Sequence, residues 1–160
     1  MVLANTAIAN RITGVSNYVS GWGSPVHPES IFEVRFANAT ENLGVNESLH
    51  TTYTTLRERG NPNVVQGFGD LVGTTSLLTN LGFAGISANG SGGTFSGRSD
   101  DVRNLLFERG SAARGTARIE CTKFIGKNGF PNLDNIPLIR LPEIWLTRAE
   151  ARGMAMLPNG

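Results

Sequence analysis

The sequence of 160 residues has little charge and almost no cysteine. Charged side chains make up 17%, below the roughly 25% of an ordinary soluble domain. The formal net charge is +1 and no basic run occurs, which argues against a nucleic-acid-binding protein. The single cysteine, Cys121, excludes an intrachain disulfide. No apolar run approaches the ~18 residues that a membrane-spanning helix needs.

Histidine is also scarce, and this bears on catalysis and metal binding. His27 and His50 are the two histidines of the chain, and neither lies in a nucleophile-elbow pattern. Together with Cys121 they lack the short ligand spacing of zinc sites. We therefore expect no hydrolase triad and no metal site.

The carboxylates show no local pair suited to glycoside hydrolysis, which needs two of them about 5–9.5 Å apart. Glu29 and Glu33 lie about 13 Å apart on an extended strand. Glu143 and Glu150 are separated by about 10.5 Å of helix rise. Residues distant in sequence can still meet in a fold, but the local pattern predicts a protein that is not an enzyme.

Glycine is abundant, with 20 residues, and it concentrates between residues 60 and 99. Short apolar pieces in this region are separated by Gly, Asn and Ser, so the composition predicts a Gly-rich variable loop region over 60–99. A structureless segment of this length is uncommon in a compact domain. It is therefore either functional or partly mobile.

The remaining chain alternates between helical and extended patterns. The spacing predicts a helix over 2–19, a loop over 21–28 and a half-buried strand over 29–36, where polar and apolar residues alternate. Residues 49–59 remain ambiguous between helix and strand. A short helix is expected over 100–108 and a strand over 118–125.

The clearest element is a helix that begins near Pro142, a residue suited to the first helical turn. One stripe of this helix holds Leu141, Ile144, Trp145 and Ala149. A second face carries Leu146 and small residues up to Gly153, which predicts packing on two sides and a buried Trp145. If nothing covers the second face, we expect self-association through residues 142–153.

Several segments resemble the SusD/RagB family of outer-membrane nutrient- and glycan-binding lipoproteins. Residues 137–151 (PLIRLPEIWLTRAEA) resemble the family's "PLLRYAEVYLMYAEA" helix, and residues 29–36 (ESIFEVRF) resemble its "ESIFEI" strand. Residues 101–103 (DVR) and 122–124 (TKF) resemble two weaker family signals, in the same order. Leu141-Pro142 replaces the family's Tyr-Ala.

The resemblance implies a single SusD/RagB-like domain fragment over residues 1–160, about a third of a usual member. Its fold would be mainly α with minor β, with tetratricopeptide-like helices and long Gly-rich loops. Its function would be non-catalytic binding of a glycan or other nutrient, without a cofactor, for delivery to a TonB-dependent, SusC-like transporter. The implied location is the surface of the bacterial outer membrane. Because no signal peptide or lipobox occurs, we expect a mature or truncated piece.

A different class of function stays open beside this one, a helical protein-interaction module that binds no ligand. For glycan binding, aromatic rings in or near loops are the candidate residues, because sugars stack their C–H faces on such rings. Trp22 lies between Gly21 and Gly23, where it either stays exposed or anchors the loop onto the following strand. The expected ligand-binding residues are Trp22, Tyr53, Phe68 and Phe95.

Overall fold

The computed structural model describes residues 15–36, 38–95, 101–126 and 130–155. These residues form four α-helices, three 3₁₀-helices and three two-stranded antiparallel sheets. The α-helices are α2 (Val15–Gly23), α3 (Leu49–Tyr53), α4 (Thr75–Asn80) and α5 (Leu141–Ala155); the 3₁₀-helices are η1 (Ala39–Glu41), η2 (Val102–Leu106) and η3 (Ala112–Arg114). The strands are β1 (Ser30–Val34), β2 (Phe83–Ile86), β3 (Gly92–Phe95), β4 (Phe107–Arg109), β5 (Ile119–Cys121) and β6 (Ile136–Arg140).

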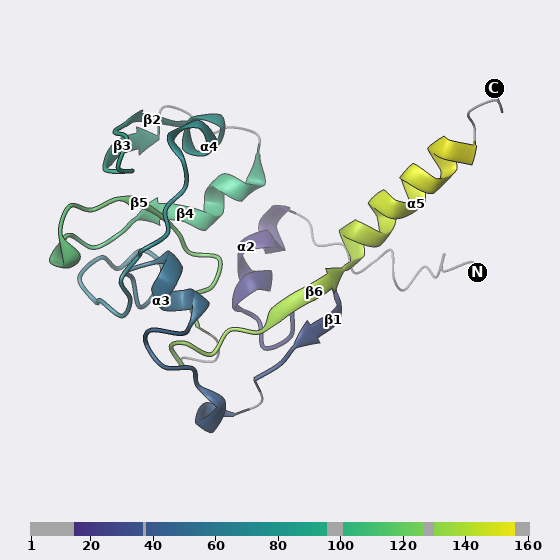
Figure 1. Ribbon diagram of the computed structural model, residues 1–160, viewed down its shortest axis with the longest axis horizontal. Helices are drawn as coiled ribbons and strands as arrows, with labels where there is room; N and C mark the ends of the chain where they lie inside the picture. Colours follow the sequence, from purple (N-terminus) through teal and green to yellow (C-terminus); the bar gives the residue numbers. More distant parts are fainter. Residues whose placement is uncertain (1–14, 37, 96–100, 127–129, 156–160) are drawn as a thin grey trace.

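The expected fold class, mainly α with tetratricopeptide-like helices, is wrong. The described part is a small α+β fold, in which helices alternate with three two-stranded antiparallel sheets. A tetratricopeptide-like array needs stacked helix pairs, but α3 and α4 have only five and six residues. The long helix α5 projects away from the other elements instead of lying against one of them (Figure 1).

The first sheet joins two segments that are about a hundred residues apart. Strand β1 pairs with β6, with Ser30 opposite Arg140 and Val34 opposite Ile136. The backbone N–H of Leu141 also donates to the carbonyl of Glu29 (2.9 Å), so this pairing continues to the start of α5. The strand expected over 29–36 is confirmed at Ser30–Val34, whereas β6 was not predicted.

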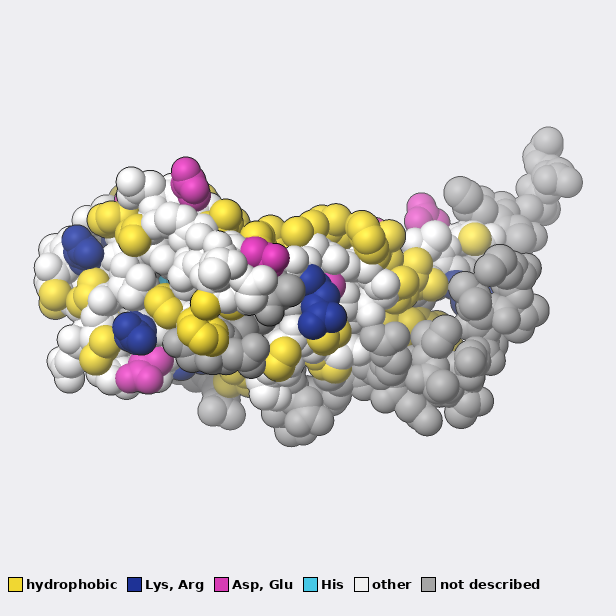
Figure 2. Space-filling model, turned by 90° about the horizontal axis from the view of Figure 1, so that it is seen from below, with side chains coloured by type: hydrophobic (Ala, Val, Ile, Leu, Met, Phe, Trp, Pro, Cys, Tyr) yellow, Lys and Arg dark blue, Asp and Glu magenta, His cyan; other side chains and the backbone are white. Residues whose placement is uncertain are grey.

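The β1–β6 pair does not bury the apolar face that its alternation predicts. Apolar side chains gather in the middle of the molecule, in the region of this pair (Figure 2). Phe32 is 57% exposed and Leu138 is 52% exposed, whereas Glu29 and Ser30 are buried. Ile31, on the opposite face, is 50% exposed as well, so the predicted strand is present but the described residues do not bury its apolar face.

The apolar core lies on the other side of the molecule, between α4 and the two remaining sheets. Hairpin β2–β3 and sheet β4–β5 lie near α4 in Figure 1. Thr74 caps α4 by accepting from the N–H of Leu77 (3.2 Å), a common N-cap arrangement. The core consists of Leu78, Leu81, Phe83 and Ile119, with Ile86 and Phe107 packed against it.

A second core is polar and has Glu120 at its centre. The side chain is 1% exposed, and its Oε2 accepts from the backbone N–H of Thr55 (2.7 Å) and the hydroxyls of Thr55 (2.9 Å) and Thr54 (3.1 Å). Gly110 leaves the room for it, because a Cβ there would lie 2.1 Å from the Glu120 carboxyl carbon. These bonds attach β5 to the segment that follows α3.

The remaining predicted elements are corrected in part. Helix α2 extends to Gly23, into the predicted loop over 21–28, and the rest of the predicted helix over 2–19 lies outside the described residues. The region 60–99 contains α4 and the β2–β3 hairpin, so it is more than a variable loop. The ambiguous segment 49–59 is helical only over Leu49–Tyr53.

Across the part of the chain that the structure describes, no helix is long and apolar enough to cross a bilayer.

Candidate functional site

Trp22 does not present a ring for sugar stacking. Its side chain is 5% exposed, and the ring of His27 meets its edge with centroids 4.5 Å apart. The Nζ of Lys123 lies 3.9 Å from the ring centroid and the guanidinium carbon of Arg140 lies 5.1 Å from it. The exposed alternative is therefore wrong: Trp22 is buried near the end of α2, against the stretch after β5 and Arg140 of β6, and it cannot stack on a sugar.

Of the other three predicted aromatics, Tyr53 and Phe68 lie in different surroundings within the described residues. Tyr53 is half-buried, and its ring lies 6.1 Å from that of Phe124, which also packs against Trp22. Phe68 lies beneath the guanidinium of Arg114, at 5.0 Å. Phe95 belongs to β3, but its side chain lies outside the described set. The structure therefore relates Tyr53 to Trp22 through Phe124, and Phe68 stays separate from that cluster.

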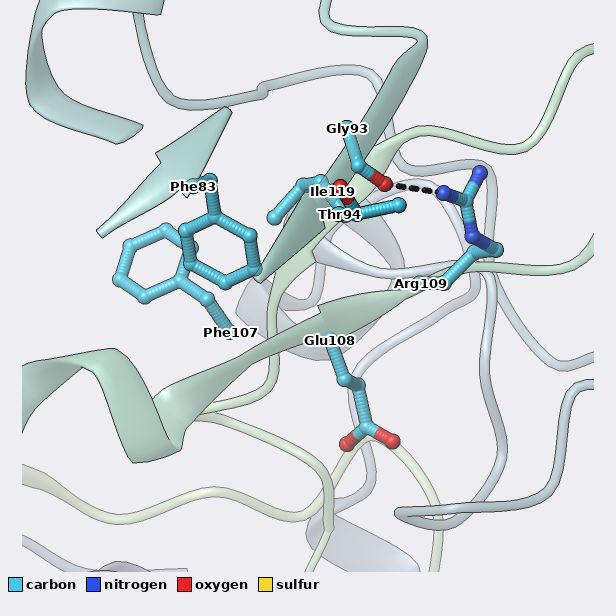
Figure 3. Close-up of a pocket in the computed structure, with 7 residues that line it drawn as sticks. All are labelled: Phe83, Gly93, Thr94, Phe107, Glu108, Arg109 and Ile119. Carbon is cyan, nitrogen blue, oxygen red and sulfur yellow. Dashed lines mark hydrogen bonds between the residues drawn. The ribbon is translucent and has the colours of Figure 1, made fainter. Parts of the chain in front are cut away.

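One cavity, of about 320 Å³, lies between the β2–β3 and β4–β5 sheets. The rings of Phe83 and Phe107 lie close together at one end, and Arg109 lies at the other, donating to the carbonyl of Gly93 (Figure 3). Glu108 points away from the two rings in the same view. The interior is therefore apolar, and it offers few partners to sugar hydroxyls. A similar apolar cavity of about 300 Å³ includes Tyr53 in its lining.

A larger cavity, of about 440 Å³, is polar. Its lining comprises Arg57, Glu58, Arg59, Ile125, Gly126, Phe130 and Pro131, and we call it the Arg59 cavity. It combines charged donors with the ring of Phe130, which is 45% exposed. Ligand sites pair apolar surface with a few fixed polar groups in this way.

The backbone around Arg59 is held from several sides. Leu56, fully buried, forms an isolated bridge with Val65, and the N–H of Arg57 donates to the carbonyl of Val64 (3.0 Å). After Arg59 the chain turns at Gly60, where φ is 73° and the N–H donates to Glu108 (2.6 Å). Residues 57–59 are thereby fixed at one wall of the cavity.

The Arg59 guanidinium is fixed by neutral oxygens alone. Its Nε donates to the hydroxyl of Thr122 (3.2 Å), one Nη donates to the carbonyl of Val19 (3.4 Å), and the other donates to the carbonyl of Thr122. Within the described residues Arg59 forms no ion pair. Burial lowers the pKa of the guanidinium from its usual value, although arginine stays protonated in proteins. The negative charges of Glu108 and Asp134 act in the opposite direction, so carboxylates lie near this guanidinium.

The acidic side chain in the lining of the Arg59 cavity, Glu58, already accepts a hydrogen bond. The carboxylate of Glu58 accepts from the side-chain amide of Asn61 at 2.6 Å. Glu58 is the one carboxylate in the lining as far as the structure describes it, whereas glycoside hydrolysis uses two. The arrangement can bind and orient a polar ligand.

The two histidines occupy separate environments. His27 accepts from the backbone N–H of Glu29 (3.2 Å) beside Trp22, and His50 bonds to the carbonyl of Leu56 (2.7 Å). Burial raises the pKa of the Cys121 thiol, so this cysteine is not an activated nucleophile. In the portion with described coordinates, no three His, Cys, Asp or Glu side chains lie close enough together to hold a metal ion.

Two partial signals for the Arg59 cavity are present in the sequence. Thr122, whose hydroxyl and carbonyl hold Arg59, is the first residue of the TKF segment that resembles a family motif. Ile125 follows that segment directly and lines the cavity. Residues 57–59, by contrast, have the appearance of an ordinary solvated charged stretch, and Phe130 lies in no periodic pattern.

No family model, no curated protein and no solved structure matches this chain.

Proposed function

We propose that this chain binds a glycan or other nutrient without catalysis, at the bacterial outer membrane, for delivery to a TonB-dependent transporter. The observation that carries the proposal is the Arg59 cavity, whose lining contains two arginines, Arg57 and Arg59, together with the exposed ring of Phe130. Sugars need both kinds of group, because their hydroxyls bond to fixed donors and their C–H faces pack on rings.

The placement of the family-like segments supports the same proposal. The ESIFEVRF segment and the PLIR start of the second segment lie side by side in β1 and β6, and the Arg140 guanidinium lies 3.4 Å from the Glu29 carboxylate. The TKF segment supplies Thr122 to the Arg59 cavity. Two of the segments that carry the resemblance thus form the β1–β6 sheet. A third supplies Thr122, which holds the side chain of Arg59.

The test of this proposal is glycan binding measured with a matched pair of phenylalanine variants. Screening the purified chain on a glycan array, followed by calorimetry, should identify a ligand that is bound and not hydrolysed. Phe130→Ala should weaken that binding roughly three- to tenfold, the worth of one aromatic contact. Phe32→Ala removes a somewhat more exposed ring outside the cavity and should leave the affinity unchanged. Release of reducing ends from the bound glycan would contradict the non-catalytic part.

The helix α5 favours a second candidate, a protein-interaction module without ligand binding. Leu146 is 71% exposed, and Ile144 and Trp145 are 39% and 38% exposed. A helix with such side chains in water favours association, and a second copy of this chain is the partner that we propose for it. Light scattering should then show dimers that Leu146→Gln disrupts. Dimers without binding to any glycan on the array would favour this candidate over the first.

A further inference from the structure

The two walls of the Arg59 cavity come from segments that are far apart in the chain. Residues 57–59 form one wall, and Phe130 and Pro131 form the other. Both walls lie outside the helices and strands of the fold. Regular secondary structure therefore does not set the distance between them, and side-chain contacts have to do so.

His50 bonds to both walls. Its Nε2 donates to the carbonyl of Leu56 (2.7 Å), and its Nδ1 accepts from the N–H of Asn132 (3.4 Å). The Leu56 carbonyl belongs to the peptide group that joins Leu56 to Arg57, and the Asn132 N–H belongs to the group that joins Pro131 to Asn132. Because a peptide group is planar and rigid, each bond fixes one end of a wall. One fully buried imidazole thus connects the two walls.

The turn at Asn132 depends on its side of this bridge. Its φ is 63°, a left-handed value that surrounding contacts must maintain in a residue with a side chain. Two such contacts are present: its Oδ1 accepts from the hydroxyl of Ser48 (3.0 Å), and its N–H donates to His50. Loss of the bond to His50 should therefore allow the wall that begins at Pro131 to move.

The charged groups that act on His50 are Arg57 and Asp134. Burial has the largest influence and lowers the pKa of His50 from its usual value of 6.5, and the charge of Arg57 lowers it further. The bond to the Leu56 carbonyl and the charge of Asp134 act in the opposite direction. Asp134 also accepts from the N–H of Gly126 (3.0 Å), which lines the same cavity. The ring is therefore neutral at pH 7, and a change in its charge occurs beside the cavity.

Resting on the proposed function, we propose that His50 is the positioning residue of the Arg59 cavity, which holds the two walls together when neutral and releases the Phe130 wall when protonated. A protonated imidazole carries N–H groups on both nitrogens, so Nδ1 can no longer accept from Asn132. The bond to Leu56 remains, because Nε2 donates in both states. The cavity then binds a glycan at neutral pH and loses the wall with the exposed ring in acid.

Fluorine NMR of the full chain tests this without a ligand, with 4-fluorophenylalanine placed at position 130 alone. On acidification from pH 7.5 the resonance should move towards that of free 4-fluorophenylalanine while circular dichroism still reports a folded chain. His50→Gln and His50→Asn should each lack this transition, because an amide does not titrate in this range. His27→Gln makes a matched change outside the cavity and should keep it.

The two amide variants also separate the two bonds of His50. A glutamine amide reaches the position of Nε2, so His50→Gln retains the bond to Leu56. An asparagine amide reaches the position of Nδ1, so His50→Asn retains the bond to Asn132. At pH 7.5 the resonance of His50→Gln should therefore resemble the acid form of the original chain, and that of His50→Asn the neutral form. If His50→Gln fails to fold, the titration of the original chain and His50→Asn still decide the matter.

The glycan array, repeated at pH 7.5 and pH 5, connects the inference to binding. Binding should weaken about tenfold for each pH unit below the pKa of His50, and His50→Asn should remove this dependence. Binding that does not weaken at pH 5, or that weakens as much with His50→Asn, would overturn the inference while glycan binding stands.

The fluorine data keep the inference separate from the proposed function. A resonance that does not move before acid unfolding, or that moves equally in the His50 variants, would overturn the inference whatever the array shows. Failure to bind any glycan at either pH would overturn the proposed function, and the resonance would still decide whether His50 positions the wall.

Discussion

Trp22 is buried in contact with both charged and aromatic side chains. The Nζ of Lys123 lies 3.9 Å from its ring centroid, and the ring of Phe124 lies 5.9 Å away at a steep angle. Burial, and then the nearby charge of Arg140, lower the pKa of Lys123. The ring counteracts this cost, because cations are attracted to the face of an indole. One tryptophan thus supports cations from two segments, β6 and the stretch after β5.

The sequence predicts that Trp145 is the buried tryptophan. Because Trp22 is buried instead, we expect Trp22 to contribute more to the stability of the fold than Trp145. Trp22→Ala should lower the free energy of unfolding by about 3–5 kcal/mol, as core aromatic truncations do. Trp145 is 38% exposed beneath Arg148, so Trp145→Ala should change it by no more than about 0.5 kcal/mol. Urea denaturation of both variants measures this. Equal losses would show that Trp145 is buried in solution, by a partner or by another part of the chain.

At the scale of elements, α3 and the segment 66–69 depend on one another. Ser48 caps α3 by accepting from the N–H of Thr51 (3.1 Å). The N–H groups of Phe68 and Gly69 then donate to the carbonyl of Thr51 (2.9 and 3.0 Å). A short helix of this kind is not stable by itself, so these contacts maintain it.

Segment 66–69 packs tightly against the α3 region at Gly67, so a substitution at this position should destabilise the protein. A Cβ at Gly67 would lie 2.1 Å from the carbonyl oxygen of Thr54 and 2.6 Å from the Cα of Thr51, both backbone atoms. We expect Gly67→Ala to destabilise the protein by more than about 2 kcal/mol, because the backbone must shift. At Gly153, within α5, a Cβ would meet nothing within 4 Å. Gly153→Ala should thus be neutral or stabilise by up to about 1 kcal/mol.

Thermal unfolding of the two alanine variants provides the measurement. A Gly67→Ala protein as stable as the original chain would contradict the close packing of segment 66–69 on α3.

At the scale of the whole molecule, the buried His50 should make stability depend on pH. The ring is 0% exposed; its Nε2 donates to the carbonyl of Leu56 (2.7 Å), and its Nδ1 accepts from the N–H of Asn132 (3.4 Å). This pattern requires the neutral ring. Burial lowers the pKa of His50 below its usual value of 6.5.

The sign of this effect is fixed by proton binding. Below about pH 6.5 the unfolded chain protonates this histidine while the folded chain does not, so acid favours unfolding. The contribution is fully present above pH 6.5 and decreases by at most about 1.4 kcal/mol per pH unit as the pH falls. His50→Gln, neutral at every pH, should lose this slope in denaturation series between pH 7.5 and 5. The same slope in both proteins would contradict the neutral, buried state of His50.

Local signals predicted some of the elements, and they predicted the environments of these elements poorly. The alternation over residues 29–36 and the helix beginning near Pro142 are both present, as β1 and α5. The burial assigned to each was wrong, since Phe32 and Trp145 are both exposed. Periodicity states which residues share a face, but it does not state whether another element covers that face.

The sequence by itself determined the local features: caps such as Ser48 and Thr74, the positive-φ turn at Gly90, and the start of α5. These depend on neighbours within a few residues, through steric limits and short hydrogen bonds. Tertiary structure alone decided the rest. Glu120 finds its donors on Thr54 and Thr55, about 65 residues earlier, and Arg59 finds its acceptors at Val19 and Thr122. A polar side chain is buried only where distant backbone and hydroxyl groups replace its water, and no spacing along the chain records which groups those are.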